Sequence, residues 1–157
     1  MGVRSALEMS AESCGHADRI DSCMTQVTAQ TLNAITETII GCAIDVHRAF
    51  GAGLLESAYA ACLCHDLSAA GLKTERQKSL PLVHRGLKLK CAYRADIVVA
   101  DQVLVEVKAV ERTSPVFERQ IRTYLRLGDY RVGLLLNFGL PTMKEGIDRI
   151  VNDFPDE

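Results

Sequence analysis

The stretch from Tyr93 to Lys108, YRADIVVADQVLVEVK, constrains the fold more than any other part of the chain. It consists of two apolar runs rich in valine on either side of the polar residues Asp101 and Gln102, a pattern typical of a β-hairpin. In an antiparallel pair, directly opposed residues share one face of the sheet. The length of the turn therefore decides which charged side chains of this hairpin lie together.

The apolar pattern selects one register for the hairpin. A two-residue turn would oppose Asp96 to Val107 and put Glu106 on the other face. A three-residue turn, residues 100–102, opposes Asp96 to Glu106 instead. The rest of that register is Arg94 with Lys108, Val98 with Leu104, and one apolar face made of Ala95, Ile97, Val99, Val103, Val105 and Val107. Because a slip by one residue exchanges the two faces, the sequence favours this register or a bulge with the same effect.

The consequence is two carboxylates and an ammonium on one face of a sheet. Asp96 and Glu106 repel each other unless a cation lies between them, and carboxylate oxygens suit a hard ion such as Mg²⁺. Lys108 points to the same side as Glu106 and is placed to orient a water or to stabilise charge on a phosphoryl group. The alternative is a solvated sheet face that carries an ordinary Glu–Lys pair.

Composition limits the class of protein. A chain of 157 residues with 48% hydrophobic residues and a net charge of −2 fits a single globular domain. It has no apolar run long enough to span a membrane and no signal-peptide core, and Ala6 breaks the myristoylation pattern, so we expect a cytoplasmic protein without membrane partners. Its six cysteines form no CxxC pair and are expected to be reduced. Cys14, His16 and Cys23 lack a fourth zinc ligand.

The order of elements predicts an α/β domain behind a flexible arm. We assign residues 1–28 to the arm and residues 29–157 to the domain. Periodicity predicts helices over 32–50, 54–70 and 115–127, strands over 73–82, 87–91 and 131–138 beside the hairpin, and a short helix over 143–154. The strand after the hairpin turn, the third helix and the strand over 131–138 should form a right-handed parallel crossover.

Positive charge is concentrated between the second helix and the hairpin. The segment contains a single acid, Glu75, and seven cations: Lys73, Arg76, Lys78, Arg85, Lys88, Lys90 and Arg94. Segregated charge of this sort fits a track for a phosphate backbone. Edge strands protected from aggregation by lysines would give the same composition, so the sequence leaves both interpretations open.

Four sequence blocks carry a resemblance to a known family. They are GLLESAY at Gly53–Tyr59, YRAD at Tyr93–Asp96, VEVKAV at Val105–Val110 and LLNFG at Leu135–Gly139. With them the chain resembles the GxxExxY proteins, a branch of the PD-(D/E)XK nuclease superfamily, over about residues 32–151. The resemblance implies an α/β fold with a restriction-endonuclease-like core, a mixed central β-sheet flanked by α-helices. Ala95 stands where the superfamily often has proline, and no cysteine set matches the iron–sulfur clamp of some relatives.

The resemblance also implies a metal site. Its ligands to Mg²⁺ or Mn²⁺ would be Asp96, Glu106, the Val107 carbonyl and, directly or through a water, Glu56. Lys108 would lie at the attacking water. From position alone, Glu56 needs no such role, because a carboxylate in the first turn of a helix is favoured by the helix dipole.

A substrate path beside the metal is implied by a second block. Gln120 and Tyr124 stand four residues apart, as in the Q-x-x-x-Y motif of RecB-like nucleases, and would line the DNA path. Gln120 is counted with the catalytic residues, and Tyr124, Arg94 and Arg122 with those that bind substrate. The implied activity is hydrolysis of phosphodiester bonds in DNA, with RNA as a further substrate. The alternatives are a nucleic-acid or protein-binding module without turnover, and a subunit of a larger repair or defence complex; protein partners and a homo-oligomer stay open.

Overall fold

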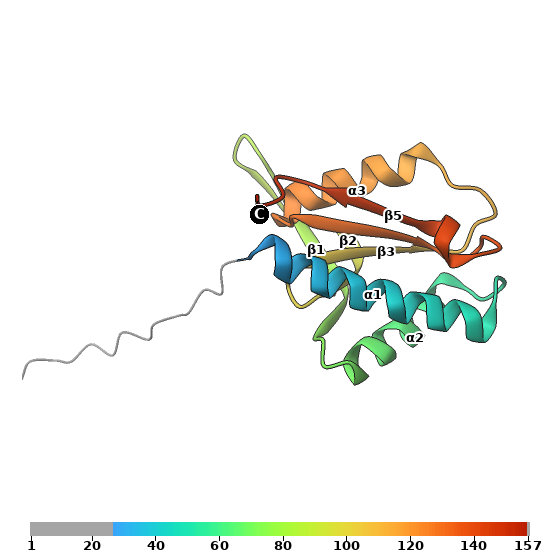
Figure 1. Cartoon of the computed structure of the whole chain (residues 1–157). Helices are drawn as coiled ribbons and strands as arrows, with labels where there is room; N and C mark the ends of the chain where they lie inside the picture. Colours follow the sequence, from blue (N-terminus) through green and yellow to red (C-terminus); the bar gives the residue numbers. More distant parts are fainter. Residues whose placement is uncertain (1–26, 157) are drawn as a thin grey trace, which may run out of the picture.

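A single mixed sheet organises the domain. The computed structural model describes residues 27–156, and within them five strands lie in the order β1-β2-β3-β4-β5 (Figure 1). β3 and β4 are parallel, and the other neighbouring pairs are antiparallel. The strands are β1 Thr74–His84, β2 Leu87–Val99, β3 Val103–Lys108, β4 Val132–Asn137 and β5 Ile147–Val151. This is the expected α/β architecture, with helices on both faces of a mixed sheet.

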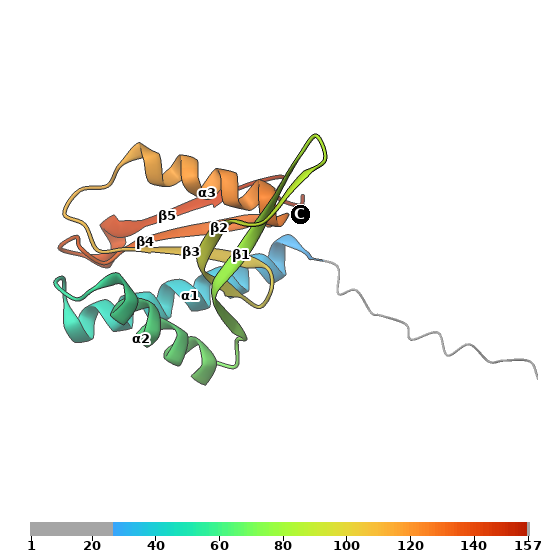
Figure 2. The same ribbon diagram turned by 180° about the vertical axis from the view of Figure 1, so that it is seen from behind.

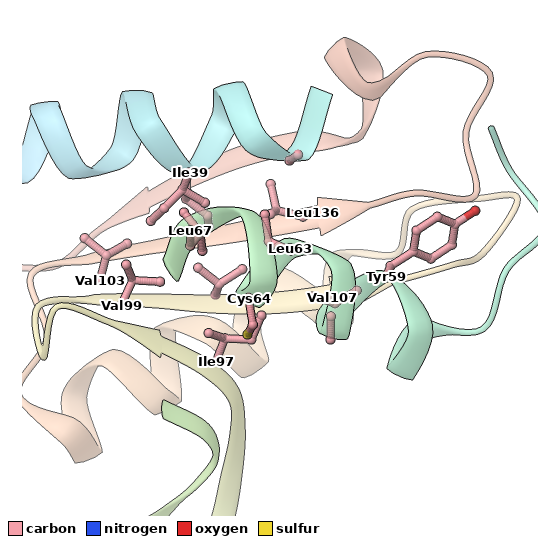
Figure 3. Close-up of a cluster of buried hydrophobic side chains, with 14 of the residues drawn as sticks. Ile39, Tyr59, Leu63, Cys64, Leu67, Ile97, Val99, Val103, Val107 and Leu136 are labelled. Atoms are coloured by element: carbon pink, nitrogen blue, oxygen red, sulfur yellow. The ribbon is translucent and has the colours of Figure 1, made fainter. Parts of the chain in front are cut away.

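Two helices, α1 Ala29–Phe50 and α2 Glu56–Ala69, cover one face of the sheet (Figure 1). The Thr28 hydroxyl caps α1 by accepting a hydrogen bond from the Thr31 amide at 3.1 Å. Both helices bury one apolar stripe against the odd-numbered valines of β3 and their neighbours (Figure 3). The α1 part of that stripe is the one predicted from sequence, Leu32, Ile35, Ile39, Ala43 and Val46.

The third helix, α3 Pro115–Gly128, covers the opposite face (Figure 2). Ser114 caps it, accepting a hydrogen bond from the Val116 amide at 3.3 Å, and Pro115 takes the first helical position, as the sequence predicts. Ile121 and Leu125 pack against Leu104 and Leu135 in a second, smaller core. α3 connects β3 to β4, which are parallel as expected; the right hand of this crossover stays a prediction.

The hairpin register is confirmed where the two strands pair. Ile97 lies opposite Val105, Val98 opposite Leu104, and Val99 opposite Val103. Ala100 and Asp101 adopt left-handed backbone conformations with φ of 52° and 56°, which reverse the chain within the three-residue turn. The pairs printed for this ladder end at Ile97 and Val105, so the expected pair of Arg94 with Lys108 does not form.

The ladder ends there because β1 and β2 are both irregular at one level. Gln77 has a φ of 53°, and no backbone pair joins it to Asp96, although the pairs on either side are regular. As a result Ile97 packs under α1 and α2, whereas Ala95 packs under α3. The expectation that Ala95 shares a face with Ile97 is therefore wrong, because the ribbon changes faces at Asp96.

The end of the chain also differs from expectation. Residues 143–154 do not form a helix: a short 3₁₀ turn, η1 Met143–Gly146, leads into β5, which pairs antiparallel with β4. A Cβ at Gly146 would lie 2.1 Å from the carbonyl oxygen of Asn137, so only glycine allows this approach to β4. The free backbone groups along β4 need partners, and β5 supplies them.

Within residues 27–156, no helix is long and apolar enough to cross a membrane. Cys42, Cys62, Cys64 and Cys91 are free thiols, in line with the expected reduced state. Residues 1–26, and with them Cys14, His16, Cys23 and nearly all of the expected arm, lie outside the described residues.

Candidate active site

Asp96 lies where β2 separates from β3, and its side chain replaces a missing backbone partner. Its Oδ2 accepts a hydrogen bond from the Val107 amide at 3.0 Å, and its Oδ1 accepts one from the Gln77 side chain at 3.2 Å. The irregularity at Gln77 and Asp96 thus opens the sheet at Val107 and directs a carboxylate into the opening. Because backbone groups of one strand residue point to the same side, the Val107 carbonyl faces this opening too.

Glu106 and Lys108 lie on the face of β3 that α3 covers. Only 4% of the Glu106 side chain and 16% of the Lys108 side chain are exposed, and Lys108 Nζ lies 2.8 Å from Glu106 Oε1. Lys108 also lies 5.3 Å from the centre of the Phe117 ring on α3. The second oxygen of Glu106, Oε2, is buried and has no hydrogen-bond partner. A buried carboxylate oxygen without a partner is costly, so this atom is suited to an additional ligand.

The protonation of this pair follows from burial and neighbouring charge. Burial, followed by the charge of Asp96, raises the pKa of Glu106 from 4.5 to about 7, against the opposing effect of Lys108. For Lys108, burial is the largest single influence and lowers the pKa. The hydrogen bond to Glu106 and the nearby carboxylates outweigh it, so the pKa of Lys108 lies above its ordinary value. Lys108 is therefore an ammonium at neutral pH, while Glu106 titrates near neutrality.

Glu56 reaches the same region from the other side of the sheet edge. It is the first residue of α2, and its Oε1 accepts a hydrogen bond from the Ala109 amide, just beyond β3, at 3.3 Å. Its charge contributes to raising the pKa of both Glu106 and Lys108. The four charged groups predicted from sequence thus interact electrostatically as one cluster.

Tyr59 fixes the loop that presents Glu56. Its ring is fully buried and stacks on Phe138 with centroids 4.4 Å apart, which confirms the prediction that Tyr59 is a core residue. Its hydroxyl donates to the Gly51 carbonyl and accepts from the Leu54 amide. The tyrosine therefore holds the α1–α2 loop in place as well as filling the core.

Gln120 and Tyr124 lie together on α3, facing the cluster. The Gln120 side-chain amide donates to the Tyr124 hydroxyl. Burial raises the pKa of Tyr124, and the charges of Glu106 and Asp96 add to the increase, which places its hydroxyl near them. The Tyr124 ring also contacts Tyr93 of β2, with centroids 5.4 Å apart.

The structure does not bring two of the predicted substrate-binding residues into this cluster. Arg122 is exposed and forms a salt bridge of 2.7 Å with Glu118, one turn earlier on α3. Arg94 is exposed on β2 beyond the irregularity, and its guanidinium lies 4.0 Å from the Cys91 sulfur. Neither contacts Asp96, Glu106 or Lys108 through a hydrogen bond or salt bridge in the part of the chain that the structure describes.

The donor set fits a divalent ion only in part. Over residues 27–156, no three histidine, cysteine, aspartate or glutamate side chains gather closely enough to hold a metal. The nearest candidates are the carboxylates of Asp96 and Glu106 and the Val107 carbonyl. The unpartnered Glu106 Oε2 and the mutual repulsion of the two acids are what an ion would relieve. Oxygen donors of this kind match Mg²⁺ or Mn²⁺, with waters completing the shell.

One functional neighbour was missed from sequence. Asn137 is fully buried at the end of β4: its Oδ1 accepts from the amides of Val110 and Gly139, and its Nδ2 donates to the Val110 carbonyl. It ties the segment after Lys108 to the end of β4. The signal available was a polar residue inside the apolar run before Phe138, which is unusual for a buried strand.

The fold and this cluster define the class of protein. A mixed sheet flanked by helices, with acids from β2 and β3 and a lysine two residues after the second acid, is a restriction-endonuclease-like α/β core. A family model described as the PD-(D/E)XK nuclease superfamily matches residues 33–150, and the chain belongs to that superfamily. No curated protein and no solved structure matches the chain.

Proposed function

We propose that the protein is a nuclease that hydrolyses phosphodiester bonds in DNA and depends on Mg²⁺ or Mn²⁺. The observation that carries this proposal is the buried, unpartnered Oε2 of Glu106 beside Asp96 and Lys108, in a chain that belongs to a nuclease superfamily. Within the superfamily we assign it to the GxxExxY branch, from Gly53–Tyr59, and to the RecB-like group, from Gln120 and Tyr124. We place its action in the cytoplasm.

Each side chain has a distinct part in this mechanism. Asp96, Glu106 and the Val107 carbonyl hold the ion, with Glu56 acting directly or through a water. The bound ion supplies a Lewis acid beside the scissile phosphate. Lys108, an ammonium at neutral pH, donates hydrogen bonds to the phosphate oxygens and stabilises the negative charge that builds up on them. Gln120 and Tyr124 line the path of the substrate on the α3 side.

Cleavage of plasmid DNA tests the proposal. Wild-type protein with Mg²⁺ or Mn²⁺ should nick the plasmid, and Asp96→Asn and Lys108→Ala should lower the rate at least about a hundredfold, the scale of losing one electrostatic contact to a transition state. Asp101→Asn is the matched control, since it makes the same chemical change in the exposed turn of the same hairpin. Equal cleavage by wild type, Asp96→Asn and Lys108→Ala would overturn the proposal.

One observation favours a second candidate, a nucleic-acid-binding module without turnover. In the described part of the chain no three acids converge, and Lys108 already offsets part of the charge of Glu106. In that case DNA binding would be sensitive to salt and insensitive to divalent ions, and no product would form. Cleavage that appears only when a partner protein is added would point instead to a subunit of a larger complex.

A further inference from the structure

The outer part of the β1–β2 hairpin, residues 81–94, takes no part in the candidate active site; we call it the arm. It extends past the helices as a two-stranded ribbon (Figures 1 and 2). Every residue from Val83 to Cys91 is exposed, and Val83 and Leu87 are 66% and 56% exposed. A bare ribbon with apolar side chains and unpaired edges is a surface on which another molecule can dock.

The charge of the arm is of one sign. It carries four cations, Arg85, Lys88, Lys90 and Arg94, and neither aspartate nor glutamate. All four are exposed, and none forms a salt bridge with another residue of the range 27–156. At the base of the hairpin, by contrast, Lys73 pairs with Asp101. In a protein whose net charge is −2, an acid-free cationic ribbon is complementary to a polyanion.

The two faces of the arm differ in chemistry. Leu82 lies opposite Leu89 and His84 opposite Leu87, so these side chains share one face. Val83 lies opposite Lys88 on the other face, to which the alternation of β2 also assigns Lys90. One face therefore offers leucines, and the other offers two ammonium groups about two residues apart along the same strand.

The arm begins beside the candidate active site. Tyr93, at its base, contacts Tyr124, and three residues later β2 reaches Asp96. Leu87 and Asp96 are nine residues apart, which spans at most about 30 Å of extended strand. Roughly nine phosphates of a nucleic-acid strand, spaced by about 3.4 Å, cover the same length. A strand bound at Asp96 can therefore continue along the arm.

We propose that the arm binds the phosphodiester backbone of duplex DNA outside the active site, through Lys88 and Lys90, while its leucines pack against the sugars. The direction of the substrate rests on the proposed function, whereas the binding itself does not require cleavage. A second copy of the chain is a poorer occupant, because arm-to-arm contact would bring eight cations together without an acid.

Binding without cleavage tests the proposal. The full chain is titrated into a labelled duplex in EDTA while salt is raised from about 50 to 200 mM, and anisotropy gives the slope of log affinity against log salt. For Lys88→Ser/Lys90→Ser we expect weaker binding and a slope smaller by about two. The control, Arg48→Ser/Lys144→Ser, removes the same charge from α1 and η1 and should keep the wild-type slope. Equal unfolding midpoints verify that both variants fold.

The outcomes separate the two proposals. DNA binding that depends on the arm, without nicking in Mg²⁺ or Mn²⁺, supports the arm and refutes the nuclease. Nicking with an unchanged salt slope in the arm variant refutes the arm and keeps the nuclease. A wild-type dimer in sedimentation that dissociates on Leu87→Ser/Leu89→Ser, with unaltered DNA binding by Lys88→Ser/Lys90→Ser, would make the arm a self-association surface and also overturn the proposal.

Discussion

Glu106 destabilises the folded protein above neutral pH, and replacing it with glutamine should remove that effect. Its pKa is 4.5 in an ordinary environment and about 7 in the folded protein. Between these values the folded state binds more protons than the unfolded state, so the free energy of unfolding falls as pH rises. For one such group the loss between about pH 5 and pH 8 is about 2 to 3 kcal/mol. The side chain is only 4% exposed, so solvent screening does little to reduce this figure.

Urea unfolding at several pH values measures the effect. Glu106→Gln resembles the protonated acid and keeps an oxygen for Lys108, so its stability should be flatter between about pH 5 and pH 8, and it should exceed wild type at the upper end. Glu37→Gln is the matched control, because Glu37 is exposed on α1; it should follow the wild-type curve. Parallel curves for wild type and Glu106→Gln would refute the assignment of Glu106 as a buried carboxylate held near neutral pKa.

Three further predictions follow from the same geometry. Mn²⁺ should raise the unfolding temperature of wild type at about pH 8 but not that of Glu106→Gln, because the ion binds only the folded carboxylates; an equal rise in both would place the ion elsewhere. Gly139→Ala should cost at least about 2 kcal/mol, since its Cβ would lie 2.5 Å from the Val110 backbone, whereas Gly41→Ala in open space on α1 should be neutral or stabilising; equal effects would contradict the close approach. Tyr59→Phe should cost about 1 to 3 kcal/mol, because the Gly51 carbonyl and the Leu54 amide lose their partner, and it should lower cleavage through Glu56; unfolding by urea and the nicking rate measure the two effects, and an unchanged stability would remove the clamp.

The fold class and the acid pair were both predictable from the sequence. The alternation of valines around Asp101 and Gln102 fixed the hairpin register, because any slip would have exposed an apolar face. Helical periodicity gave α1 and α3 with their caps at Thr28 and Ser114, since these depend on neighbouring residues alone. The assignment of Glu56, Gln120 and Tyr124 needed the family resemblance, because each has an ordinary structural explanation by itself.

Other features were decided by contacts between distant parts of the chain. The side of the sheet on which Ala95 packs depends on the irregularity at Gln77 and Asp96, which no local pattern in β2 reveals. The segment over 147–151 has apolar spacing compatible with a helix, yet the open edge of β4 draws it into the sheet. Sequence periodicity records which residues must be buried. Only the tertiary structure determines the partner that buries them, because unsatisfied backbone groups and the available space belong to elements far away in the chain.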